Sequence, residues 1–336
     1  MERSTEESRL KRLSAYWGDW RPLTFLLLPL TLLFCLLVGL RRWGYRSGLL
    51  GSSRLPVPVV VVGNISVGGT GKTPLVIWLA QWLRQRGWRP GILTRGYGGR
   101  AGATPREVTA DRRADEVGDE AVLLRRRAAC PVYVGSRRVE SGRRLLAQHP
   151  CDILIADDGL QHYALRRDLE LLVIDGERRF GNGLCLPAGP LREPVRRLRS
   201  TDLRVCNGAP GPGEYAMQVA GDRAFPLKGN APPRRLSEFI GSPVVAVAGI
   251  GNPGRFFAML EAAGLEIRPH AFPDHHRFSA EDLAPFHGST VLMTEKDAVK
   301  CELFANDSLW YIPAVATLEP PFIERLEPLI DRLKDG

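Results

Sequence analysis

The sequence has little cysteine: its 336 residues include six, at positions 35, 130, 151, 185, 206 and 301, with no C-x-x-C pair. Zinc ribbons, dithiol redox motifs and disulfide scaffolds need closely spaced cysteines, so the spacing excludes these classes. Acidic residues are also in deficit, with 37 Asp and Glu against 46 Lys and Arg, a net charge of +9. This excess, partly in clusters such as 125–127, predicts anionic partners or simply a solvated basic surface.

Long uncharged stretches are rare, and the exception lies near the N-terminus. Residues 23–40 (LTFLLLPLTLLFCLLVGL) carry no charged side chain, and Trp17, Trp20, Trp43 and Tyr45 flank them. Such a segment is long enough to cross a bilayer, and aromatic rings suit the membrane interface. We predict a membrane helix here, with an interfacial or re-entrant helix as the alternative. Arginines on both sides leave its orientation open.

A glycine-rich loop follows this segment. Residues 57–62 (VPVVVV) predict a buried strand, and a helix is predicted from near Lys72 to Gly87. Strand, glycine loop, G-K-T and helix form the context of a Walker A motif, although Ser66 replaces its usual first glycine. Lys72 would reach the β- and γ-phosphates of ATP, and the Thr73 hydroxyl would bind Mg²⁺. The residues predicted to bind ATP in this loop are Ser66, Val67, Gly68, Gly69, Thr70, Gly71, Lys72 and Thr73.

A second strand delivers acidic residues to its carboxyl end. Residues 151–156 (CDILIA) predict a buried strand that ends in Asp157 and Asp158, which is typical of a Walker B motif. Ligands collect at the carboxyl ends of parallel strands, so we expect these acids to lie near the glycine loop. Either one would hold Mg²⁺ directly or through water, the alternative being a turn or helix-cap aspartate.

Between these motifs lies a second glycine loop, RGYGG. Arg95 and Tyr97 suit a phosphate or a sugar face, although a structural turn explains the loop equally well. Asp119 begins a predicted helix, where an acid usually serves only as a cap. The formal G-x-G-x-x-G at 249–254 contains a proline, and we interpret it as a tight strand-to-helix turn rather than an NAD or FAD site.

The alternation of strands and helices predicts an α/β protein with mostly parallel sheets. We expect a P-loop NTPase-like parallel sheet domain and a second, smaller α/β domain, with an N-terminal membrane helix. The predicted divisions are 1–50, 51–208, a connection at 209–240, and 241–336. Within these we expect a strand pair at 215–219 and 223–226, and a strand-end loop at 294–297.

The runs SVGGTGKTP, RGYGG, VGDE, ADDGLQH, LPAGPLREP, FPDHHRF and MTEKDAV together resemble the tetraacyldisaccharide 4′-kinase family. The resemblance covers almost the whole chain. It implies transfer of the ATP γ-phosphate to the 4′-hydroxyl of a tetraacylated glucosamine disaccharide 1-phosphate, a lipid A precursor. It further implies a location in the bacterial inner membrane, with the catalytic domains facing the cytoplasm.

The resemblance also implies roles for residues. Asp119 resembles the catalytic acid/base of the family, and His275 the histidine that assists it, with His276 as the alternative. Arg95 and Tyr97 resemble residues that contact the phosphate or the substrate. The implied Mg²⁺ environment consists of Asp157, Asp158 and Glu193.

The expected partners are the lipid-linked disaccharide, ATP and membrane lipids, with no obligate protein partner. The sequence shows no aromatic-basic RNA motif or helix-turn-helix reader, so we predict no nucleic-acid partner. The main alternative is a membrane-associated P-loop ATPase switch that hydrolyses ATP to control a partner. Such switches commonly carry a lysine just before the two glycines, where this chain has Val67.

Overall fold

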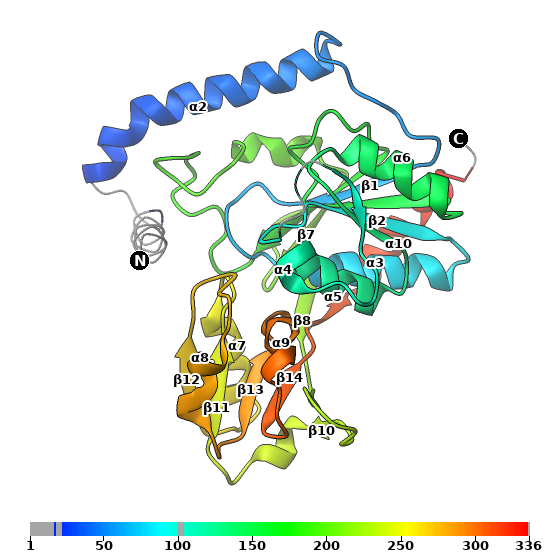
Figure 1. Ribbon diagram of the computed structural model, residues 1–336. Coiled ribbons are helices and arrows are strands. Elements are labelled where there is room, and N and C mark those ends of the chain that lie inside the picture. The colour runs from blue at the N-terminus through cyan, green and yellow to red at the C-terminus, as the bar shows by residue number, and fades with distance from the viewer. Residues whose placement is uncertain (1–16, 18–21, 100–101, 103, 335–336) are drawn as a thin grey trace. The chain divides into compact units, whose positions relative to one another are not determined.

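The computed structural model describes residue 17 and residues 22–99, 102 and 104–334 (Figure 1). The chain forms two compact units, each assembled from separate stretches of sequence. The first contains the chain up to Lys72, Asp152–Met217 and the chain from Leu318 onward. The second contains Thr73–Cys151 and Gln218–Thr317.

The first unit is built on a parallel sheet in the order β5-β1-β6-β7-β8. All five residues of β1 are buried, as expected for a strand covered on both faces, and this explains its β-branched sequence. Because the strands are parallel, their carboxyl ends lie along one edge of the sheet. The strands are β1 (Val59–Gly63), β5 (Ile153–Asp157), β6 (Leu169–Asp175), β7 (Leu203–Asn207) and β8 (Tyr215–Ala220).

Helices α10 (Pro320–Asp331) and α2 (Pro22–Arg46) contribute to the first unit in opposite ways. Helix α10 buries the apolar face formed by Phe322, Leu326 and Ile330, whose spacing of four residues places them on one side of a helix. In α2 the buried residues are instead small, namely Thr24, Thr31 and Gly44, and most of its leucines are exposed.

The second unit begins with the chain that follows Lys72. Helix α3 buries Leu75, Leu79 and Leu83 at helical spacing. Strand β4 pairs in parallel with β2 and antiparallel with β3. The elements are α3 (Lys72–Gln85), β2 (Pro90–Thr94), β3 (Arg106–Glu107), α4 (Ala114–Val117), α5 (Asp119–Ala128), β4 (Val132–Val134) and α6 (Arg138–Gln148).

The rest of the second unit is a sheet in the order β10-β9-β14-β13-β11-β12. Strands β11 to β14 pair in parallel, and β9 and β10 add an antiparallel edge. Along β11, Ala246 packs into one apolar cluster while Val245 and Val247 pack into another, so the strand buries both faces. The strands are β9 (Arg223–Pro226), β10 (Arg234–Arg235), β11 (Val244–Ala248), β12 (Ile267–Ala271), β13 (Val291–Thr294) and β14 (Leu309–Ile312).

Helices α7 (Pro253–Ala262), α8 (Ala280–Leu283) and α9 (Glu295–Cys301) accompany this second sheet, and β15 (Val315–Leu318) leads on to α10. The 3₁₀ helices are η1 (Val195–Ser200) in the first unit, and η2 (Leu236–Phe239), η3 (Ala284–Phe286) and η4 (Glu302–Phe304) in the second. The prediction of an α/β fold with mostly parallel sheets is confirmed.

The structure differs from the sequence-based expectation in two places. The strands predicted at 215–219 and 223–226 exist, but they do not pair with each other: β8 joins β7 in parallel, and β9 pairs with β14 and β10. Strand propensity predicts that a segment is extended, but it does not predict which strand pairs with it. The stretch 294–297, predicted as a loop, begins α9, because Thr294 caps that helix by accepting a hydrogen bond from the Asp297 N–H at 3.2 Å.

Candidate functional site

The predicted phosphate loop lies in the first unit, between β1 and the start of α3. Gly68 and Gly71 have φ values of 91° and 93°, a backbone conformation that glycine adopts without steric cost. A Cβ added to Gly71 would lie 2.7 Å from the Asn207 side-chain nitrogen, so the loop has no room for a larger residue there. Successive glycines and a helix start form the cradle that phosphate binding requires.

Side chains from neighbouring strand ends hold this loop. Arg178 donates a hydrogen bond to the Gly69 carbonyl and pairs with Asp175, at the end of β6, at 2.9 Å. Asn207, at the end of β7, donates to the Thr70 carbonyl at 3.4 Å. Sequence reasoning missed these supporting residues. For Asn207 the signal that could have found it is a polar residue at the end of a buried strand, as for Asp157, whereas Arg178 lies three residues beyond β6 and has no such signal.

Lys72 lies opposite Asp158, with 3.5 Å between the Lys72 Nζ and a carboxylate oxygen. Arg192 contacts the same carboxylate at 3.0 Å. Burial alone would raise the pKa of Asp158, but the charges of Lys72 and Arg192 outweigh burial and lower it. Asp158 also has a φ of 50°, an uncommon conformation outside glycine. The structure therefore brings the predicted Lys72 and Asp158 together as an ion pair.

The other predicted magnesium residues have different surroundings. Asp157 is buried at the end of β5. Glu193 is 1% exposed, and it accepts hydrogen bonds from Gln161 at 2.7 Å and from the Tyr163 hydroxyl, with Arg197 at 3.3 Å. Among the described residues, no group of three or more His, Cys, Asp or Glu is placed to hold a metal by itself.

In the second unit, Asp119 and His275 form a hydrogen-bonded pair. They are 156 residues apart in sequence, and the His275 Nδ1–H donates to Asp119 Oδ2 at 3.2 Å. Asp119 is the first residue of α5 and is 4% exposed, so the helix N-terminus favours its negative charge. His275 has a φ of 58°, and such strained residues cluster at functional sites. His276 instead contacts Asp282 at 3.2 Å.

Two lysines of α9 complete the surroundings of this pair, and sequence reasoning assigned neither to it. Lys296 Nζ lies 3.1 Å from Glu120, 3.5 Å from Asp274 and 3.4 Å from His275 Nε2. Lys300 lies 3.9 Å from Asp119 and 2.7 Å from Asp297. The first turn of α5 and the first two turns of α9 therefore contribute to one partly buried charge cluster around His275.

Electrostatics within the cluster favour a charged pair. Burial alone would raise the pKa of Asp119, but the hydrogen bond from His275 and the charge of Lys296 lower it from 3.8 to about 2. Burial alone would lower the pKa of His275, and Lys296 acts in the same direction. The contact with Asp119 outweighs both and raises the His275 pKa above 6.5.

The predicted loop residues Arg95 and Tyr97 are both exposed. The Tyr97 ring lies over the His275 ring, with 4.7 Å between their centroids. Because the Tyr97 side chain is exposed, it can contact a ligand bound beside His275 without any rearrangement of the protein. Arg95 has the same accessibility, so both side chains remain available for the contact that the resemblance implied.

In the formal G-x-G-x-x-G at 249–254, the backbone N–H of the first glycine already has a hydrogen-bond partner within the protein. The Gly249 N–H donates to the buried Asp297 carboxylate at 2.8 Å, and a Cβ on Gly249 would lie 3.1 Å from the same side chain. The Asn252 side chain caps α7 by accepting from the Arg255 N–H. These contacts match the tight strand-to-helix turn expected for this motif.

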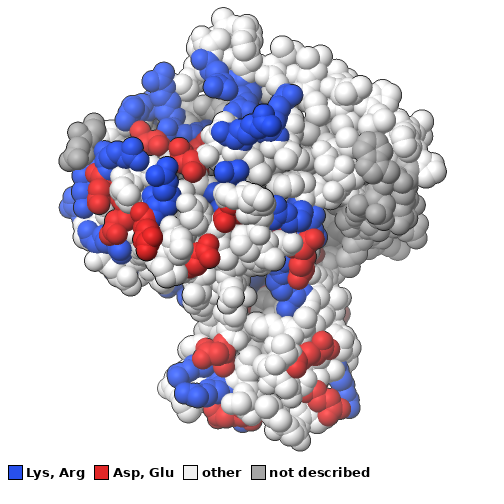
Figure 2. Space-filling model, turned by 180° about the vertical axis from the view of Figure 1, so that it is seen from behind, with Lys and Arg blue, Asp and Glu red and all other residues white. Residues whose placement is uncertain are grey.

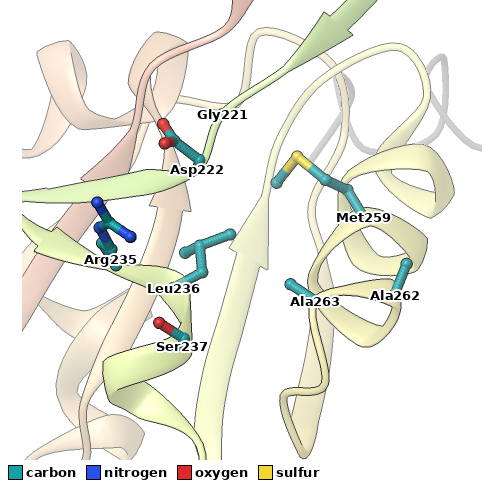
Figure 3. A pocket seen from close by; sticks show the side chains of 8 residues that line it. All are labelled: Gly221, Asp222, Arg235, Leu236, Ser237, Met259, Ala262 and Ala263. Carbon is teal, nitrogen blue, oxygen red and sulfur yellow. The ribbon is translucent and has the colours of Figure 1, made fainter.

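Two surface features lie outside these sites. A hollow of about 470 Å³ in the second unit is bordered by Asp222, Arg235 and Ser237 on one side and by Met259 and Ala262 of α7 on the other (Figure 3). It contains none of the predicted site residues. On the face drawn in Figure 2, basic and acidic side chains are intermixed.

Part of the arginine excess is engaged in ion pairs. Arg126 pairs with Glu302, and Arg127 pairs with Glu295 at 2.6 Å. Two arginines of the 125–127 cluster thus have acidic partners on the protein itself, which favours the solvated-surface interpretation for that cluster.

The class of protein follows from the first unit. A glycine loop joins a buried parallel strand to a helix that starts with Lys72 and Thr73, and the paired strand β5 ends in the acid Asp157. This arrangement defines the P-loop class of nucleotide-binding proteins.

Comparisons with known proteins give the family. The family model described as Tetraacyldisaccharide-1-P 4′-kinase matches residues 23–331. The tetraacyldisaccharide 4′-kinase of Nitrosococcus oceani is 54% identical over 91% of this chain and 90% of its own length. That of Methylobacillus flagellatus is 50% identical over 96% of this chain and 97% of its own length. The chain belongs to the tetraacyldisaccharide 4′-kinase family.

A solved structure agrees with this assignment. The crystal structure of LpxK from Aquifex aeolicus in complex with ATP superposes with a TM-score of 0.78 at 30% identity. The match covers 93% of this chain and 99% of that chain. The predicted fold class is therefore confirmed by a relative that carries the nucleotide.

Proposed function

We propose that this protein transfers the γ-phosphate of ATP to the 4′-hydroxyl of a tetraacylated glucosamine disaccharide 1-phosphate, a lipid A precursor. In this proposal it works at the cytosolic face of the bacterial inner membrane. The observation that carries the proposal is the hydrogen bond between the buried Asp119 and the half-buried His275, because these are the residues that the family resemblance named for proton transfer. The names of its relatives supply the substrate class.

ATP would be held by the phosphate loop. The backbone N–H groups from Ser66 to Gly71 and the N-terminus of α3 direct positive potential at the phosphates. Lys72 adds a cation that would exchange its contact with Asp158 for the β- and γ-phosphates. This exchange leaves Arg192 to neutralise Asp158, so the carboxylate keeps a partner when the nucleotide binds.

The residues present fit Mg²⁺, which prefers oxygen ligands and usually keeps several waters beside one or two carboxylates and substrate phosphates. The Thr73 hydroxyl and Asp157 would hold it, with Asp158 and Glu193 in the surrounding shell because their oxygens already accept contacts from protein donors. When bound, the ion neutralises charge on the transferred phosphate.

Asp119 would accept the proton of the acceptor hydroxyl. Its pKa of about 2 keeps the carboxylate ionised at neutral pH, and the Glu120 N–H holds its other oxygen at 2.8 Å. His275 fixes the orientation of Asp119 and can share the proton across the 3.2 Å hydrogen bond. Arg95 and Tyr97 are proposed to contact the transferred phosphate or the sugar.

Helix α2 supports the membrane location. Among the described residues it is the single helix long and apolar enough to cross a bilayer, and 11% of its apolar window is buried. A helix whose leucines face outward and an acceptor that is itself a lipid point in the same direction.

The deciding experiment is transfer of ³²P from ATP to the lipid A disaccharide precursor. We expect transfer by the wild type and a loss of about 10²–10⁴-fold in Asp119→Ala, the range for removal of a general base. His276→Gln is the matched control, because it changes the neighbouring histidine without touching Asp119, and its rate should stay near that of the wild type.

The same assay separates the kinase from the ATPase switch. A switch hydrolyses ATP without any lipid acceptor and needs no phosphate transfer to a sugar. If ATP were hydrolysed at the same rate with and without the acceptor and no labelled lipid formed, the kinase proposal would be rejected in favour of the ATPase switch. The absence of a nucleic-acid partner and of an obligate protein partner stays a prediction.

A further inference from the structure

A hollow of about 350 Å³ lies in the first unit where the C-terminal end of α2 meets the segment 163–170 and η1. Its border is unusually basic. Six arginines line it together with a single acidic residue, Glu170. We call this hollow the arginine pocket, after Arg42, Arg46, Arg54, Arg166, Arg167 and Arg197.

Half of these arginines are neutralised by the protein. Arg197 is 2% exposed and donates to both Glu170 oxygens, at 2.6 and 2.7 Å. Arg167 pairs with Glu170 at 3.2 Å. Arg54 pairs with Asp168 at 3.0 Å. Because these three arginines have acidic partners, the net positive charge of the pocket comes from the other three arginines.

Arg42, Arg46 and Arg166 provide that charge. In the part of the chain that the structure describes, none of the three takes part in an ion pair, although each borders the same hollow. Neutral hydrogen bonds hold two of them in place: Arg42 donates to the Ser200 hydroxyl at 2.8 Å, and Arg166 to the Ser52 hydroxyl at 3.1 Å. Three guanidinium groups without an ion-pair partner, two of them positioned by hydroxyl groups, form a site for an anion, and guanidinium matches phosphate geometry.

The end of α2 is fixed to the body at this pocket. The Tyr45 and Tyr163 rings lie 5.9 Å apart, and the Arg41 guanidinium lies 5.9 Å from each ring centroid. Gly44 is buried, and a Cβ there would lie 3.1 Å from Leu50. The position of the pocket along α2 is therefore set by the fold.

That position matches lipid phosphates. The uncharged run of α2 ends at Leu40, so Arg42 and Arg46 follow within about 10 Å along the helix axis, at 1.5 Å per residue. Thr31, in the middle of that run, hydrogen-bonds Cys185 and Ala188, so α2 lies along the body with its exposed leucines available to the lipid, and its terminal arginines then lie at the level of the headgroup phosphates. Trp43, between the two arginines, is 60% exposed, as expected for a ring at the interface.

We propose that the arginine pocket binds the phosphate of an anionic membrane lipid headgroup at the C-terminal end of α2. The site would fix the depth of the protein at the membrane surface. It rests on the membrane placement in the proposed function but not on kinase chemistry. The phosphate loop is formed by other residues, so the two anion sites can be tested separately.

The test uses the full-length protein in a neutral detergent, titrated calorimetrically with short-chain phosphatidylglycerol in the absence of ATP and acceptor. We expect Arg46→Gln to weaken binding about fivefold and Arg42→Gln/Arg46→Gln about 30-fold at low salt, since each arginine near a lipid surface contributes about 1 kcal/mol. Arg46→Lys should retain most of the affinity. Arg268→Gln/Arg325→Gln removes two charges from exposed arginines outside the pocket and should bind like the wild type.

Three results would overturn the proposal. The first is equal weakening in the control pair, which would show a general charge effect. The second is binding of short-chain diacylglycerol, which has no phosphate, as tightly as phosphatidylglycerol. The third is displacement of the lipid at equal affinity by inorganic phosphate or by the disaccharide 1-phosphate substrate, which would assign the pocket to that source of phosphate instead. This titration measures lipid binding and not phosphate transfer, so its result can be interpreted even if the kinase assay fails.

Discussion

Replacing His275 with glutamine tests the charged pair directly, because glutamine keeps a hydrogen-bond donor but has no charge at any pH. The structure gives the size of the effect in two ways. Lowering the Asp119 pKa from 3.8 to about 2 corresponds to about 2 kcal/mol in favour of the ionised carboxylate. A hydrogen bond involving a charged group contributes about 1.5–3 kcal/mol. Since Lys296 and Lys300 still neutralise part of the carboxylate, we expect His275→Gln to lower the free energy of unfolding by about 1–2 kcal/mol near pH 6.

This loss depends on pH with a definite sign. The folded-state pKa of Asp119 lies below 3.8, so its contribution is complete above pH 3.8 and disappears as the pH falls toward 2. The pKa of His275 is raised above 6.5, so its contribution is complete below pH 6.5 and disappears as the pH rises through the raised value. The difference between wild type and His275→Gln is therefore largest between pH 3.8 and 6.5 and shrinks in alkaline solution.

The assay is denaturant unfolding of the full-length protein in neutral detergent, followed by near-ultraviolet circular dichroism at a series of pH values. His276→Gln is the matched control. Its partner Asp282 and His276 itself are both 25% exposed, so solvent screens that pair more strongly and the effect should be smaller. If His275→Gln became more destabilising with rising pH, or cost no more than His276→Gln, the charged pair inferred from the contact would be wrong.

Four further changes have definite expected outcomes. Lys72→Met should lower ³²P transfer by about 10²–10³-fold, as for loss of a positioned charge, without unfolding the protein, as circular dichroism would check. Lys296→Met should move the acid limb of the kcat/KM profile to higher pH, because the Lys296 charge lowers the pKa of Asp119, which must be ionised to accept the proton; an unmoved limb would contradict this. Gly71→Ala should abolish ATP binding in calorimetry, because its Cβ would lie 2.7 Å from Asn207 and its φ of 93° disfavours alanine. Thr31→Val should lower the unfolding free energy by about 1–2 kcal/mol, since the Ala188 N–H donates to the Thr31 hydroxyl at 3.0 Å, while flotation with vesicles stays unchanged.

Much of the first unit could be predicted because its signals are local. The β-branched run before the glycine loop and the G-K-T that starts α3 each occupy a few consecutive residues. Backbone geometry makes such a segment adopt one conformation wherever it occurs. The same is true of α2, where an uninterrupted apolar run is sufficient to predict a long helix. The start of α9 is also a local signal, because the T-x-x-D pattern from Thr294 to Asp297 is typical of a helix cap rather than of the loop that we predict there.

Strand partners and supporting side chains were harder to predict. Strands β8 and β9 lie three residues apart in sequence, yet they join different neighbours. Arg178 and Asn207 hold the phosphate loop from β6 and β7 ends that are adjacent to it only after the sheet has formed. Periodicity shows which side of a strand is buried, but it contains no information about which strand lies beside it.

By itself, the sequence determined that this protein has a phosphate-binding loop, an acidic strand end and an apolar helix, because each depends on neighbouring residues and on backbone chemistry. The tertiary structure alone decided that His275 rather than His276 meets Asp119, that two lysines of α9 surround them, and that six arginines gather where α2 ends. These contacts join residues far apart in the chain. They form only when packing fixes the strand order and the helix positions, and no local pattern specifies that packing.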